Sequence, residues 1–82
     1  MTPAARTALG LSQAAYARAI GVAQPHLCRV ERQQQAVSDW MALVDELVTA
    51  AIDSAGADAV REALVPGLSR ADLVRGLVRL DG

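Results

Sequence analysis

Residues 11–32 contain two short amphipathic patterns separated by one glycine, and this arrangement constrains the fold more than any other feature of the 82-residue chain. Ser12 is a good N-cap for the first pattern. A stripe of three apolar side chains then follows at helical spacing: Tyr16, Ala17 and Ile20. Gly21 comes next, where a helix often ends in a residue that tolerates positive φ. The sequence therefore predicts a helix that stops at Gly21.

The second pattern begins at Ala23 or Gln24 and ends near Glu31. Its first turn contains Pro25, and the N–H that proline lacks would have no helical partner at that position. With about 100° of rotation per residue, Leu27 and Val30 form the inward stripe. The opposite side holds Pro25, Arg29 and Arg32, with Cys28 beside them. The outward face of this predicted helix is therefore basic and polar.

Helical patterns flank this region on both sides. Thr2 and Pro3 form an N-cap and N1 pair for a helix over residues 3–9, which ends at Gly10 and has Ala5, Ala8 and Leu9 inward. After a polar loop at 33–36, Ser38 is the expected N-cap of a longer helix. Its apolar residues have the strongest helical period in the chain: Trp40, Leu43, Val44, Leu47, Val48 and Ala51. Residues 54–57 interrupt this period.

Two more helices are expected in the C-terminal part, over residues 58–64 and 70–80. Pro66 and Gly67 stop the first, and Ser69 with Asp72 resembles a capping box at the start of the second. The last helix has a wide apolar face: Leu73, Val74, Leu77, Val78 and Leu80. Because no segment alternates with period two, the sequence predicts an all-α fold, a compact bundle of about five to six short helices.

Charge is distributed unevenly along the chain, which contains no lysine. Residues 1–35 hold four arginines against Glu31 alone, a balance of +3, whereas residues 36–82 hold four arginines against eight acids, a balance of −4. A basic first half suits a polyanionic partner. The alternative is ordinary solvated surface charge. Tyr16 and Trp40 are the two aromatic residues, and both are expected in the core, which disfavours RNA binding by base stacking.

Several functional classes have little support. One cysteine, Cys28, and one histidine, His26, cannot form a structural zinc site within one chain, and a lone cysteine forms no internal disulfide. No glycine-rich phosphate loop, metal-ligand cluster or activated nucleophile is visible, so we expect neither an enzyme nor a cofactor. No apolar run has the length of a signal peptide or a membrane span, which favours a soluble cytoplasmic protein.

The stretch LSQAAYARAIGVAQPHLCRVER resembles the helix-turn-helix of Cro/C1-type DNA-binding proteins, also called the xenobiotic-response-element family. The matching residues are Leu11, Ser12, Gln13, Tyr16, Ala17, Ile20, Gly21, Val22, Gln24, Leu27, Val30 and Glu31. The resemblance implies a helix-turn-helix DNA-binding region over residues 1–52. From the apolar face of the last helix, we expect residues 53–82 to be a helical dimerisation region of the same small domain. The resemblance further implies a small regulator of the kind that plasmids and phages encode.

Three departures from the family pattern stand out. Ala23 replaces the usual Ser or Thr N-cap, at a typical cost of ~1 kcal/mol. An Arg-Gln-Gln segment replaces the common Asn-Gly or Arg-Gly turn after Glu31, which puts phosphate contacts there in doubt. The first helix is also shorter than usual.

A B-DNA major groove accepts one α-helix, and in this motif the first residues of the second helix meet the base edges. The expected base-contacting residues are Gln24, Pro25, His26 and Arg29. Arg29 can bond guanine O6 and N7, and Gln24 can bond adenine N6 and N7. His26 is equally well interpreted as a surface histidine. For Arg29 and Arg32 the alternative is ordinary solvated charge, which the surrounding motif disfavours. By the resemblance, Gln13 contacts a phosphate and braces Gln24. Arg32 and the loop of Gln33, Gln34 and Gln35 would follow the DNA backbone.

Specific affinity usually needs two half-sites, so we expect a homodimeric repressor on a palindromic operator, without a small-molecule effector. The expected interface is Leu68, Leu73, Val74, Leu77, Val78 and Leu80. The alternative is that this face folds back on the helix that follows Ser38. A second functional hypothesis is an antitoxin-like protein that binds a partner protein through its acidic C-terminal half and autoregulates its operon.

Overall fold

The computed structural model describes residues 4–82 and contains six helices and no strand in that range: α1 (Ala4–Leu9), α2 (Gln13–Ile20), α3 (Gln24–Glu31), α4 (Asp39–Ala55), α5 (Ala57–Ala63) and α6 (Arg70–Asp81). The predicted all-α class is confirmed. The expected helix start at Pro3 lies outside the described residues. None of the helices in the described part is long and apolar enough to cross a membrane.

Side-chain caps set the starts of three helices. The hydroxyls of Ser12, Ser38 and Ser69 accept hydrogen bonds from the backbone N–H three residues later, at 3.1, 3.2 and 3.1 Å. Each bond satisfies one of the amides that a helix start leaves without a partner. Gly21 ends α2 in the left-handed conformation, with φ 77°. All four features follow the sequence prediction.

The boundary between α4 and α5 is tighter than predicted. α4 continues to Ala55, and Gly56 alone separates it from α5, which occupies residues 57–63 rather than 58–64. Gly56 has φ 92°, a conformation that residues with a Cβ rarely adopt, so the chain reverses at one residue instead of four. α6 likewise runs one residue beyond its predicted end, to Asp81.

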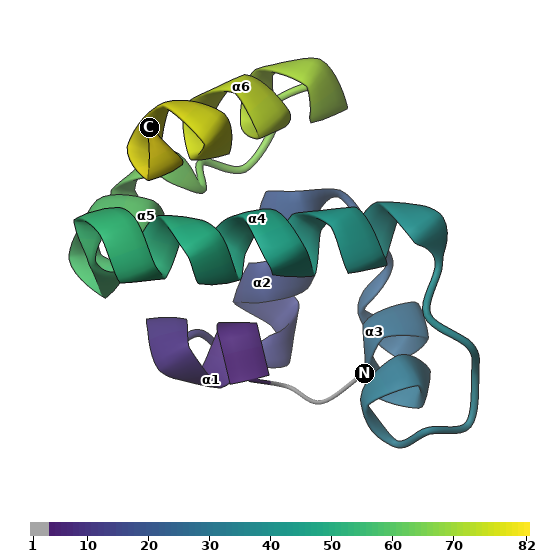
Figure 1. Cartoon of the computed structure of the whole chain (residues 1–82). Helices are drawn as coiled ribbons and strands as arrows, with labels where there is room; N and C mark the ends of the chain where they lie inside the picture. The colour runs from purple at the N-terminus through teal and green to yellow at the C-terminus, as the bar shows by residue number, and fades with distance from the viewer. Residues whose placement is uncertain (1–3) are drawn as a thin grey trace.

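α4 is the central element: α6 packs along one side of it, α1 and α3 lie on the other side, and α2 passes behind it (Figure 1). α6 runs parallel to α4, because Arg70 at its start lies over the Trp40 ring while Asp81 at its end accepts a hydrogen bond from Ser54. The buried side chains form one cluster with members from every helix. The regions 1–52 and 53–82 therefore share one hydrophobic core.

The core confirms most of the predicted inward residues, corrects three of them and adds Met41. Met41 was not in the predicted α4 stripe, yet it is fully buried, whereas Leu43 is 43% exposed. Ala8 was expected inward in α1 and is exposed. Trp40 is half-buried: it packs against the core, and its indole N–H donates to the Ile20 carbonyl at 2.7 Å. These differences arise because the apolar stripes are wider than the surface that neighbouring helices cover.

The predicted interface on α6 also needs correction. Leu73 and Leu77 are 2% and 0% exposed within the single chain, because α6 folds back on α4. Burial within the chain removes both residues from the expected dimer interface. Val78 and Leu68 remain exposed, and Val74 and Leu80 are half-buried.

Candidate nucleic-acid interface

The α2–α3 pair presents one side of α3 to solvent. Leu27 and Val30 are buried, at 0% and 1% exposure, and hold α3 against the core. Pro25 and Arg29 lie on the opposite side and are exposed, as are Gln24 at the helix start and Arg32 at its end. His26 and Cys28 are half-buried at the two flanks. The structure therefore brings the predicted base-contacting residues onto one helix, with His26 the least accessible of them.

The start of α3 lacks a side-chain cap. Ala23 has the extended conformation of an N-cap residue, but its methyl group accepts no hydrogen bond. The first amides of α3 therefore point outward without a side-chain partner, unlike those of α2 and α4. Helix N-termini of this kind attract anions.

A polar network joins α1, α2 and α3 behind this face. Arg6 donates to both carboxylate oxygens of Glu31, at 2.8 and 3.0 Å, and also to the Leu11 carbonyl at 3.0 Å. Gln13 donates to the same carboxylate at 3.0 Å. The Glu31 side chain is 6% exposed, so these are charge-assisted bonds in a partly dry site. Glu31 thus joins α3 to Arg6 of α1 and Gln13 of α2.

This network changes the role predicted for Gln13. The resemblance implied a contact between the Gln13 side chain and Gln24, but the Gln13 amide nitrogen donates to Glu31 instead. Glu31 is the stronger acceptor because it carries a full negative charge. One N–H of the Gln13 amide remains available for another acceptor.

The pKa of Glu31 is the balance of two opposing effects. Burial alone would raise it, but the hydrogen bonds from Arg6 and Gln13 and the charge of Arg6 outweigh burial and lower the pKa below its ordinary value. The hydrogen bond that Arg6 donates to the Glu31 carboxylate in turn raises the pKa of Arg6. Both groups are therefore charged across the physiological range.

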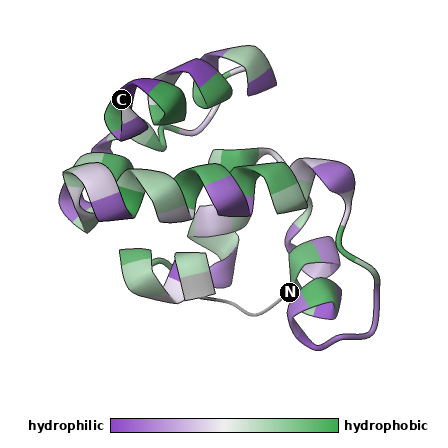
Figure 2. Ribbon diagram, in the orientation of Figure 1, coloured by the Kyte–Doolittle hydropathy of each residue, from purple (hydrophilic) through white to green (hydrophobic). Residues whose placement is uncertain are grey.

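The turn after α3 explains the unusual Arg-Gln-Gln segment. The Gln33 N–H bonds the Val30 carbonyl at 3.0 Å, and the Gln34 N–H bonds the Arg29 carbonyl at 2.8 Å. This pair of bonds is the Schellman pattern, in which the C′ residue is left-handed and usually glycine. Gln33 takes that position with φ 62°, a positive φ that no other non-glycine residue of the described chain has. The loop that follows is hydrophilic (Figure 2).

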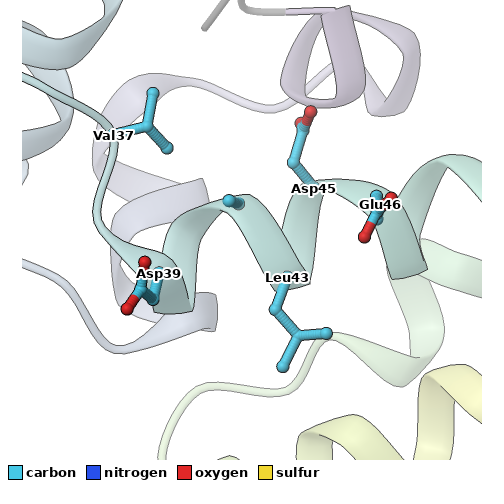
Figure 3. A pocket seen from close by; sticks show the side chains of 6 residues that line it. Val37, Asp39, Leu43, Asp45 and Glu46 are labelled. Carbon is cyan, nitrogen blue, oxygen red and sulfur yellow. The ribbon is translucent and has the colours of Figure 1, made fainter.

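The first turns of α4 carry a shallow hollow of opposite charge (Figure 3). Its lining combines three apolar and three acidic residues: Val37, Ala42, Leu43, Asp39, Asp45 and Glu46. Leu43 and Asp45 point to opposite sides of α4 (Figure 3). Because it is acidic, this surface is unsuited to a phosphate backbone. Exposed positive charge therefore lies on α3 and negative charge on the first turns of α4.

Two polar side-chain atoms are buried without a hydrogen-bond partner among residues 4–82. They are the Tyr16 hydroxyl on α2 and Asp45 Oδ1 on α4. Burial raises the pKa of Asp45, and burial together with the nearby Asp45 carboxylate raises that of Tyr16. Tyr16 is therefore neutral and belongs to the core. In residues 4–82, no three His, Cys, Asp or Glu side chains gather closely enough to bind a metal ion.

Comparisons with known proteins give no relative for this chain: no protein-family model matches it, and neither the curated proteins nor the solved structures provide a match.

Proposed function

We propose that this protein is a sequence-specific DNA-binding repressor that places α3 in the major groove. The observation that supports this most directly is the division of α3, whose apolar side is buried while Gln24, Pro25 and Arg29 are exposed together on the remaining surface. The resemblance of residues 11–32 to the Cro/C1-type motif supports the same function. An α-helix with its side chains is about 10–12 Å across, and the major groove is about 12 Å wide.

The contacts divide into two kinds under this proposal. Arg29 bonds guanine and Gln24 bonds adenine, so these two residues supply sequence specificity. Arg32, Gln33 and Gln34 are all exposed at the end of α3 and contact the sugar-phosphate backbone. Gln13 contributes the second N–H of its amide to a phosphate while Glu31 holds the first.

The repressor acts as a homodimer on two half-sites about 34 Å apart. The longest dimension of the chain is 34 Å and the others are 22 and 20 Å, so two copies side by side span this separation. Large exposed apolar residues for the contact are Leu43, Val65, Leu68 and Val78. Leu68 and Val78 belong to the interface expected from sequence, and we propose them as its centre.

Selection of bound sites from random double-stranded DNA, followed by gel-shift titrations over a range of salt concentrations, tests this function. The wild-type chain is expected to select a palindrome and to lose affinity steeply as salt rises. Arg29→Ala should weaken the selected site about 5- to 100-fold and relax specificity at one position per half-site. Arg79→Ala is the matched control, since it removes an exposed arginine from α6, away from α3.

The proposal fails if no salt-sensitive, sequence-specific complex forms, or if Arg29→Ala and Arg79→Ala have equal effects. Sedimentation equilibrium tests the dimer separately. Leu68→Glu and Val78→Glu are expected to shift the chain toward monomer, whereas Thr49→Glu, an exposed site on α4, should not. A monomeric wild-type chain would contradict the homodimer.

A further inference from the structure

The Arg29 side chain is held by a residue outside its own helix. Its Nε donates to the side-chain oxygen of Gln35 at 3.0 Å, and among residues 4–82 Gln35 is the one hydrogen-bond partner of the Arg29 side chain. A guanidinium carries five N–H groups, one on Nε and two on each terminal nitrogen. The bond to Gln35 uses the first and leaves the four terminal ones free.

The turn after α3 is what brings Gln35 to Arg29. Residues six apart in a continuous helix lie nearly two turns from each other and cannot bond in this way. The left-handed Gln33 and the bond from the Gln34 N–H to the Arg29 carbonyl reverse the chain at this point. Gln35 therefore returns beside the side chain of the residue whose carbonyl anchors the turn.

We propose that Gln35 is a positioning residue that orients Arg29 so that its two terminal nitrogens face a guanine. This inference rests on the proposed function, because it requires Arg29 to contact a base. A free arginine side chain samples many rotamers, and fixing Nε removes part of that freedom before DNA binds. The terminal nitrogens then bond guanine O6 and N7 together. Gln35 itself contacts no base.

The sequence predicted a different role for this residue, as part of a loop that follows the DNA backbone. A backbone contact would contribute equally to every DNA sequence. A positioning role contributes only where Arg29 meets a guanine. Loss of the Gln35 side chain should therefore reduce discrimination between guanine and adenine only if Gln35 positions Arg29.

The experiment uses the full chain and the site that the wild-type protein selects. Each guanine of the site is replaced in turn by 7-deazaguanine, which lacks the N7 acceptor, and affinities are measured at fixed salt. The guanine that Arg29 contacts is the one whose replacement weakens the wild-type complex and leaves the Arg29→Ala complex unchanged. Affinities are then compared for adenine and guanine at that position.

Gln35→Ala is expected to weaken binding to the guanine site about three- to tenfold and to leave the adenine site unchanged. In a double variant with Arg29→Ala, Gln35→Ala should cause no further loss of DNA affinity. Gln35→Glu retains an acceptor for Nε and is expected to preserve discrimination. Gln34→Ala is the matched control for discrimination: its side chain does not bond Arg29 and is assigned to the DNA backbone, so its loss is expected to weaken the guanine and adenine sites alike.

Two results would overturn the positioning role while leaving DNA recognition by Arg29 intact. One is that Gln35→Ala changes neither affinity nor discrimination. The other is that it weakens both sites equally and adds to Arg29→Ala, which identifies a direct backbone contact. If the wild-type chain selects no site, or Arg29→Ala binds as wild type does, the proposed function fails, and the positioning role fails with it.

Discussion

The α2–α3 pair and the α4–α6 pair are both two-helix units, but different interactions stabilise them. α2 and α3 have eight residues each, join at Gly21, and are tied to α1 by the network around Glu31. α4 and α6 have 17 and 12 residues and pack through an apolar contact that buries Leu73 and Leu77. The α2–α3 pair leaves one face of α3 exposed, and polar contacts at its edge add to the apolar contacts of Leu27 and Val30.

The largest expected change in stability concerns the apolar contact between α4 and α6. Leu77→Ala removes a fully buried side chain beneath α6 and should destabilise the chain by about 2–5 kcal/mol, because it loses transfer free energy and leaves a cavity. Urea denaturation measures this change. Val78→Ala, one residue along at 50% exposure, is expected to cost under about 0.5 kcal/mol when both variants are measured at a concentration at which the chain is monomeric. Equal losses would show that α6 does not bury one face against α4.

The next effect tests the polar network. Glu31→Gln removes the charge that accepts bonds from Arg6 and Gln13, and should cost about 1–3 kcal/mol at neutral pH. Because the folded-state pKa of Glu31 lies below its ordinary 4.5, its contribution is complete above pH 4.5 and is lost as pH falls through the folded-state pKa. The difference between Glu31→Gln and wild type should therefore shrink in acid, as denaturation at several pH values would measure.

Asp45→Asn is the control, because its expected effect on stability at neutral pH is opposite in sign to that of Glu31→Gln. Burial raises the pKa of Asp45, so this group favours the folded state when protonated and opposes it as pH rises through the folded-state pKa. Asp45→Asn should therefore stabilise the chain at neutral pH, with a benefit that declines in acid. If both variants changed with pH in the same direction, the contrast between the two carboxylates would be wrong.

Helix caps give a smaller effect and distinguish α2 from α3. Ser12→Ala removes the bond to the Ala15 N–H and should destabilise the chain by about 1 kcal/mol. Ala23→Ser supplies the cap that α3 lacks and should stabilise it by about the same amount. Thermal denaturation of both variants checks this pair, and a destabilising Ala23→Ser would contradict the capping geometry at α3.

The smallest effect concerns the turn that ends α3. Gln33→Gly should stabilise the chain by about 0.5–1 kcal/mol, because glycine adopts positive φ without the cost that a Cβ imposes. Gln34→Gly is the matched control and should give no gain, since Gln34 does not have positive φ. Melting temperatures of the two variants measure the difference, and equal changes would argue against a left-handed Gln33.

The sequence by itself determined most helix boundaries, since these depend on local chemistry. Ser12, Ser38 and Ser69 cap helices wherever the chain around them packs, and Gly21 permits positive φ at any site. The all-α class and the outward position of Arg29 and Pro25 follow from helical periodicity in the same way.

The tertiary structure alone decided which apolar and polar side chains meet. On α6, five apolar residues were equivalent by periodicity, and only packing against α4 buried Leu73 and Leu77 while exposing Val78. Gln13 bonds Glu31 rather than Gln24, since the fold brings α2 to the end of α3 and the carboxylate is the stronger acceptor. Such pairings depend on contacts between residues distant in sequence, which local patterns do not encode.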